Sequence, residues 1–250
     1  MPTPTPTTSA PSPLPPLPPP TATPTPSPTP TATPTPVPGP GLLSWVLPFE
    51  IAGSYDAQTQ SQGDISFAGY WVVAPFGGTL GGSLEDYWAV PVDLATANVN
   101  TWFEVVPNTV LLASTSGRVD ILKNDPVVLD SGPLPVDWQI HLRVGNRGDW
   151  IEYDHVVNLL VSDGDFVEIG QPLGNAAPAA IRHGGAEGEK PVDEFEWGLR
   201  FVQPGTAIGV CPFGYLTEAE QAKLVDVLET MVALGIPSGN GPCLVQELSG

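Results

Sequence analysis

The chain has 250 residues and a one-sided charge, because 27 acidic residues against 8 basic ones give a net charge of −19. A charge of this size repels nucleic-acid phosphates and anionic lipid surfaces, so we exclude a nucleic-acid partner. The sequence also contains no apolar run long enough to cross a membrane as a helix.

The first 41 residues differ in composition from the rest of the chain. They hold 18 of the 32 prolines and 11 threonines, and the first charged residue of the chain is Glu50. Such a segment cannot bury enough apolar surface to offset its chain entropy. We therefore predict a disordered Pro/Thr-rich stalk over residues 1–41. In polyproline II conformation it reaches on the order of 120 Å.

The stalk has two interpretations, a plain spacer and a ligand for a proline-binding partner. Its hydroxyl groups are candidate acceptors for O-glycans. Stalks of this kind usually follow an anchor or a cleaved leader, and neither is visible after Met1. We therefore expect the native chain to begin further upstream.

Residues 42–205 show the pattern of a β domain. Short alternating or β-branched runs are separated by glycine-rich turns, without helices between them. This spacing predicts a mainly β fold, a sandwich or a barrel. The runs are Trp71–Val73, Val110–Leu112, Arg118–Leu122, Gln139–Val144, Trp150–Tyr153 and Glu196–Phe201.

Residues 206–250 predict an appendage with one helix. Thr217 and Glu220 have the spacing of a capping box, and Gly235 and Pro237 are expected to end the helix. The apolar residues between them recur at helical spacing and are expected on one buried face. They are Leu224, Val225, Leu228, Met231 and Val232.

The only two cysteines, Cys211 and Cys243, flank this helix. In a stalked, acidic protein they predict one disulfide and an oxidising, extracytoplasmic compartment, secreted or at the cell surface. Two buried free thiols are the alternative.

Three segments, taken in order, resemble the lysostaphin-type zinc endopeptidases, the peptidoglycan hydrolases of the LytM kind. They are Val110–Val119, Trp150–Gly174 and Phe195–Phe201. The most specific is the middle one, in which Tyr153-x-His155 precedes a Gly-Asp…Gly-Gln turn. The resemblance implies a β-sandwich of the barrel-sandwich hybrid type, built on a duplicated hybrid motif.

The resemblance also implies a zinc site, with ligands from an H-x-x-x-D motif and from the second histidine of an H-x-H strand. In this chain only Asp93 remains as a ligand, because the other two positions are Ala89 and Gly198. One carboxylate does not hold Zn²⁺ tightly. We therefore expect no metal cofactor, and zinc only if other histidines, such as His141 or His183, are recruited.

Two further positions of the family assist catalysis, and here they are His155 and Glu196. As candidates for binding we take Asp93, Tyr153, His155, Glu196 and Trp197, with Trp150 as a further aromatic contact. Each has an ordinary alternative: a strand histidine bonded to a neighbour, a turn cap, or an aromatic side chain of the core.

Three functions compete on this sequence. The first is a non-catalytic peptidase-like domain, displayed on the stalk, that binds a cell-wall peptide, a glycan or a surface protein. The second is an active zinc endopeptidase that cleaves peptidoglycan cross-links. The third is a structural protein of a surface assembly, since a fold alone does not decide function.

Overall fold

The computed structural model describes residues 44–69, 72–77, 99–124, 128–129, 132–133, 136–145, 148–179, 192–203, 206–236, 243 and 247–249. The predicted stalk lies outside these residues, as do Trp71, Ala89, Asp93 and His183.

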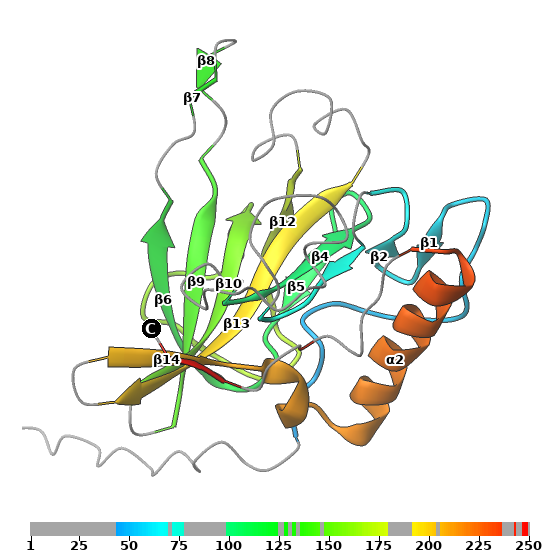
Figure 1. Cartoon of the computed structure of the whole chain (residues 1–250). Helices are drawn as coiled ribbons and strands as arrows, with labels where there is room; N and C mark the ends of the chain where they lie inside the picture. Colours follow the sequence, from blue (N-terminus) through cyan, green and yellow to red (C-terminus); the bar gives the residue numbers. More distant parts are fainter. Residues whose placement is uncertain are drawn as a thin grey trace, which may run out of the picture. The chain divides into compact units, whose positions relative to one another are not determined.

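Within the described residues, thirteen strands form one antiparallel sheet and two more form a small hairpin (Figure 1). The sheet strands in chain order are β1 (Ser61–Gln62), β2 (Ile65–Ser66), β3 (Val73–Ala74), β4 (Thr101–Val105), β5 (Val110–Leu112), β6 (Gly117–Lys123), β9 (Trp138–Val144), β10 (Asp149–Val157), β11 (Phe166–Val167), β12 (Pro172–Pro178), β13 (Asp193–Gln203), β14 (Thr206–Val210) and β15 (Glu247–Ser249). The hairpin pairs β7 (Val128–Leu129) with β8 (Gly132–Pro133).

Strand β13 is the centre of the sheet. It pairs with β4 on one side and with β10 and β12 on the other, and its last residues pair with β14. From β10 the ladder continues through β9 and β6 to β11. Strands β6, β9, β10 and β13 lie side by side in Figure 1. The predicted mainly β fold is confirmed.

The alternation of side chains along these strands separates a core face from a polar face. On the core face, Phe103 of β4 and Phe195 of β13 stack with ring centroids 5.4 Å apart, and Phe49 packs edge-on against both. Burial of each such ring stabilises the fold by about 2–3 kcal/mol.

Helix α2 (Glu218–Ala233) begins at Thr217, whose Oγ1 accepts the N–H of Glu220 at 3.2 Å. The reciprocal bond of the predicted capping box is not formed. Glu220 instead accepts the N–H of Leu47 at 3.3 Å and pairs with Lys223 at 2.6 Å. The Thr217 N–H donates to the carbonyl of Trp45. The Glu220 carboxylate and the Thr217 N–H therefore connect the start of α2 to Trp45 and Leu47, which precede the sheet.

The buried face of α2 differs from the predicted one. It consists of Leu224, Val227, Leu228 and Met231. Val225 and Val232, predicted on the same face, are 42% and 65% exposed. The helix ends at Gly235 as expected, with Gly235 at φ 73° and the Ile236 N–H donating to the Met231 carbonyl. Pro237, the second expected stop signal, lies outside the described residues. Among the described residues, no helix is sufficiently long and apolar to span a membrane.

The predicted Cys211–Cys243 disulfide is present, with a Cα–Cα distance of 6.0 Å. It packs against Phe76 and Phe213. The segment after residue 205 also adds β14 and β15 to the main sheet, because β14 pairs with β13 and β15 pairs with β14.

Candidate functional site

The polar face of the sheet carries a connected group of ionisable side chains on three neighbouring strands. His141 lies on β9, Glu152 on β10, and Glu196 and Arg200 on β13. Antiparallel pairing places Glu152 opposite His141 on one side and opposite Gly198 on the other. Both glutamates are only 8% exposed, so each requires polar partners to offset its desolvation.

A bulge in β10 shapes one end of this group. The β9–β10 register shifts between Tyr153 and Val156, and His155 lies in the left-handed region at φ 61°. A residue without glycine's freedom is seldom found there, and such strain is concentrated at functional sites. The bulge interrupts the alternation of side chains and points His155 toward Glu196 on the polar face.

His155 is held between two carboxylates. Its Nδ1 contacts the Oδ2 of Asp137, just before β9, and its Nε2 lies 3.2 Å from the Oε1 of Glu196. Burial raises the pKa of Asp137, but its hydrogen bond with His155 and the charge of that ring, helped by Asn124, outweigh burial and leave the pKa below its usual value. The two expected site residues, His155 and Glu196, therefore come together.

Asn100 connects the two buried glutamates. Its Nδ2 donates to the Oε2 of Glu196 at 2.8 Å and to the Oε1 of Glu152 at 2.9 Å. Its Oδ1 accepts from Nη2 of Arg200 at 2.8 Å. This set of partners defines the orientation of the amide, because a flipped amide would turn its oxygen toward the carboxylates and its NH₂ group toward the guanidinium.

Arg200 supplies the cation at this end of the group. Its Nη2 lies 3.4 Å from the Oε1 of Glu152, and its Nη1 donates to the carbonyl of Val99 at 2.8 Å. The guanidinium cannot lose its proton in a protein, so its positive charge is permanent. It therefore offsets part of the negative charge of the two glutamates.

Gly198 is the reason that Asn100 can reach Glu152. Gly198 lies on β13 between them, opposite Glu152 on β10 and next in register to Asn100, which precedes β4. A Cβ placed on Gly198 would lie 2.0 Å from the Oδ1 of Asn100 and 2.8 Å from the Nη1 of Arg200. The space over residue 198 is thus filled by the Asn100–Arg200 pair.

This arrangement does not fit the zinc site that the family resemblance implies. Gly198 has no side chain to act as the third ligand, and Asn100 and Arg200 occupy the space of one. A fixed guanidinium at this place also repels a divalent cation. Ala89 cannot ligate through its side chain, and Asp93 lies outside the described residues.

A smaller cluster, Asp137, Asp154 and His155, brings ligand-type atoms within 4.8 Å of one another. Its members already have partners, because Asp154 accepts from Asn124 at 2.7 Å and from Gln139 at 3.3 Å. We interpret this cluster as part of the hydrogen-bond network around the bulge.

His141 is the neutral member of the face. Burial lowers its pKa, and Arg143 and Arg200 lower it further against the opposing effect of Glu152 and Asp120. The 3.7 Å separation between its Nε2 and the Oε2 of Glu152 is therefore not an ion pair at neutral pH. The ring stacks on Trp150 at 5.1 Å, and Arg143 lies over the same indole.

Two expected binding residues lie in the core. Tyr153 and Trp197 are 0% and 1% exposed, so they are aromatic side chains of the core, the alternative given for them, and not exposed contacts. They are neighbours across β10 and β13, on the face opposite to Glu152 and Glu196. The Tyr153 hydroxyl accepts the Ser114 N–H at 2.7 Å, and burial raises its pKa to about 12.

Sequence reasoning missed four members of the site: Asn100, Asp137, Glu152 and Arg200. The sequence does contain a signal for two of them, because a charged residue between two apolar ones indicates a polar strand face. Glu152 lies between Ile151 and Tyr153, and Arg200 lies between Leu199 and Phe201. Asn100 and Asp137 precede strands β4 and β9, and no sequence pattern connects them with partners that lie 18 to 100 positions away.

No protein-family model matches the chain, and no curated protein matches it. Among solved structures, it is similar to a candidate glycyl-glycine endopeptidase LytM from Ruminococcus gnavus, with 20% identity and a TM-score of 0.32, over 46% of this chain and 44% of that one. This chain therefore spans less than half of that structure.

Two further solved structures are similar. The catalytic domain of the antimicrobial peptidase lysostaphin from Staphylococcus simulans has 16% identity and a TM-score of 0.35, over 58% of this chain and 91% of that one. The structure of the SpoIIQ–SpoIIIAH pore-forming complex has 14% identity and a TM-score of 0.40, over 71% of this chain and 94% of that one. The chain is similar in fold to solved peptidases of the lysostaphin kind, as its sequence motifs predict.

Proposed function

We propose that this chain is a non-catalytic, extracytoplasmic domain that binds a cell-wall peptide or glycan through the polar face of its sheet. The observation that carries the proposal is the position of Asn100 and Arg200. They fill the space over Gly198 and turn it into the centre of a closed hydrogen-bond network.

The network argues against acid–base catalysis by the surviving residues. A general base must offer a free nitrogen or oxygen to the proton that it removes. Both ring nitrogens of His155 face carboxylates, and Glu196 is shared between His155 and Asn100. The pair is therefore arranged to hold charge in place and not to transfer a proton.

The same groups suit polar recognition. The side chains of His155 and Glu196 keep 16% and 11% of their surface exposed, so a ligand can reach them without unfolding the sheet. Their geometry is set by the surrounding bonds, which lowers the entropy cost of binding. The disulfide is typical of proteins in oxidising compartments outside the cytoplasm, where a domain can encounter cell-wall fragments.

The test is made on the purified full chain with three measurements: zinc content, cleavage of soluble peptidoglycan fragments, and affinity for the same fragments. We expect no stoichiometric metal, no cleavage, and saturable binding. Glu196→Gln should weaken binding at least about tenfold, because it removes a charge-assisted hydrogen bond. The matched control is Glu229→Gln on an exposed position of α2.

Two outcomes contradict the proposal. A stoichiometric, chelatable zinc together with cleavage identifies an active endopeptidase. Self-association in solution without affinity for any fragment favours the assembly function. The melting temperature of each variant is recorded, so that a loss of binding is not confused with unfolding.

A further inference from the structure

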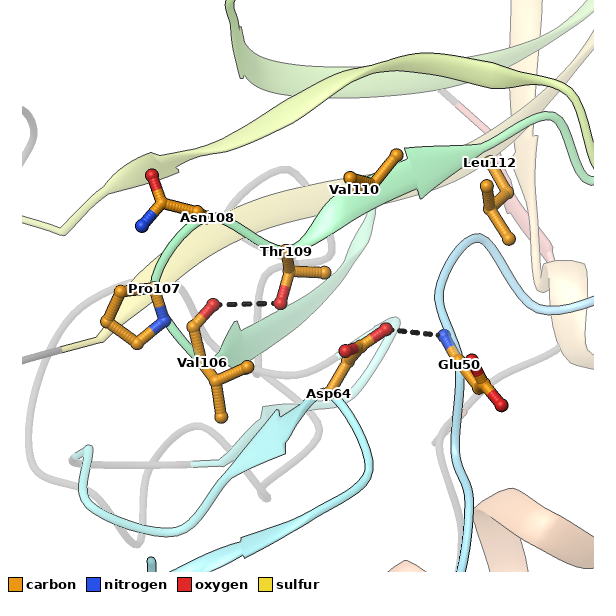
Figure 2. A pocket seen from close by; sticks show the side chains of 8 residues that line it. All are labelled: Glu50, Asp64, Val106, Pro107, Asn108, Thr109, Val110 and Leu112. Carbon is orange, nitrogen blue, oxygen red and sulfur yellow. Dashed lines mark hydrogen bonds between the residues drawn. The ribbon is translucent and has the colours of Figure 1, made fainter.

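A separate cavity of about 370 Å³ lies on another part of the sheet, and it shares no residue with the polar face (Figure 2). Its walls come from the turn between β4 and β5, from β5 itself, and from Asp64 and Glu50. The turn and β5 supply an apolar surface of Val106, Val110 and Leu112. Val110 is 39% exposed, so part of this surface is open to solvent.

Hydrogen bonds hold the turn that forms one wall in place. Thr109 donates both its N–H and its hydroxyl to the carbonyl of Val106, at 3.2 and 2.8 Å. Asn108, in the left-handed region at φ 67°, donates its N–H to the buried Asp193 and accepts from Asn175 through its carbonyl. Such a preformed wall binds a ligand without a further ordering cost.

Asp64 is one of the two acids that line the cavity, and no basic residue stands among the described lining residues. Asp64 Oδ2 accepts the N–H of Glu50, the other acid, at 2.8 Å. Burial raises the pKa of Asp64 above its usual value. The hydrogen bond from the Glu50 N–H lowers this pKa, and the negative charge of Glu50 raises it further. In Figure 2 the Asp64 carboxylate is directed toward the space below Thr109.

We infer that this cavity binds a primary ammonium group on a short alkyl chain, the chemistry of a lysine side chain. The ammonium pairs with the carboxylate of Asp64, and the methylene groups lie against Val110 and Leu112. The positive charge of an ammonium is also attracted by the net negative charge of the chain, which has 27 acidic and 8 basic residues. A neutral or anionic ligand would leave the half-buried carboxylate of Asp64 uncompensated.

The experiment titrates the full chain with n-butylammonium and follows backbone ¹⁵N–¹H shifts, with 1-butanol as the neutral probe. We expect saturable shifts at Asp64 and Thr109 with the cation, and weak ones with the alcohol. Methylammonium should bind about fivefold more weakly than butylammonium, because it lacks the methylene groups that contact the apolar wall.

Asp64→Asn should weaken butylammonium binding about fivefold or more, since the amide keeps an acceptor for the Glu50 N–H but loses the charge. The matched control is Asp56→Asn, which removes the same charge from an exposed position in the segment just before β1. It should leave the affinity within about twofold. Equal weakening by both variants, or equal binding of butanol and butylammonium by the wild type, would overturn the inference.

A second arm identifies the source of the ammonium. Nα-acetyl-lysine amide and a lysine-containing tripeptide are titrated beside butylammonium. Equal affinities support recognition of a free alkylamine. A tighter tripeptide supports capture of a lysine within a peptide. If neither lysine compound shifts the cavity residues, recognition of lysine is wrong.

Discussion

At the scale of single residues, the absence of one side chain organises the site. Gly198 leaves room for Asn100 to cross β13 and bond to Glu152, while Arg200 orients the amide from the other side. Because both glutamates are buried, the loss of any of these bonds weakens the compensation of a buried negative charge. The network is therefore sensitive to very small changes in volume.

The first prediction concerns that volume. Gly198→Ala should lower the free energy of unfolding by about 1–3 kcal/mol, since the new methyl group collides with a bonded amide. Gly214→Ala is the control, because a Cβ there meets nothing within 4 Å. Urea unfolding measures both. The double variant Asn100→Ala with Gly198→Ala should cost less than the sum of its parts, as the collision is then removed.

Equal stabilities of the two alanine variants would contradict this account. They would show that Asn100 can turn away from Gly198 without loss.

At the scale of elements, the bulge in β10 directs His155 to residues near β9 and on β13. It brings His155 between Asp137, at the start of β9, and Glu196 on β13. In a strand without the bulge, the side chain of residue 155 would point to the core face and could not contact both Asp137 and Glu196. The strained backbone of His155 is thus offset by two contacts of its ring nitrogens with carboxylates.

The second prediction is a pH dependence. The pKa of Asp137 is lower in the folded state than in the unfolded chain. Its stabilising contribution is therefore present above the unfolded pKa, about 4, and is lost as the pH falls through the folded pKa. Asp137→Asn should cost about 1–3 kcal/mol at pH 7, and its difference from wild type should shrink below about pH 4.

The control for this prediction is Asp120→Asn. Asp120 and Arg143 form an ion pair on the same face, but their side chains are 38% and 39% exposed, so the pair contributes little. Thermal unfolding from pH 3 to pH 7 separates the two cases. A difference between Asp137→Asn and wild type that stays constant over this range would contradict the assignment.

At the scale of the whole chain, the segment after β13 closes on the rest of the fold. Its strand β14 pairs with β13, and its helix buries four side chains in the main core. The Cys211–Cys243 bridge and strand β15 then return the end of the chain to the sheet. The disulfide therefore restrains a part of the core, and not a separate appendage alone.

The third prediction follows from the length of that loop. The cysteines are 32 residues apart, and a loop of this size contributes about 3–4 kcal/mol in the chain-entropy description. Cys211→Ser with Cys243→Ser should lower the melting temperature, and reduction of the wild type should lower it equally. An unchanged melting temperature after complete reduction would contradict the prediction.

The sequence alone predicted much of this architecture because local rules are strong in it. Alternation identified strands such as Gln139–Val144, turn chemistry separated them, and Gly235 ended the helix. The family motifs located His155 and Glu196. The absence of ligand side chains at Ala89 and Gly198 is also readable from the sequence, because chemical identity does not depend on packing.

The tertiary structure decided the directions of the side chains and their distant partners. It turned Tyr153 and Trp197 into the core and placed Val225 and Val232 in solvent. It also joined Asn100, Asp137, Glu152 and Arg200 to the site. Bonds between residues so far apart in the sequence depend on strand register and on a bulge at His155, and both result from the packing of the whole sheet. The histidine and cysteine positions thus come from the sequence, while the network around Gly198 is a product of the fold.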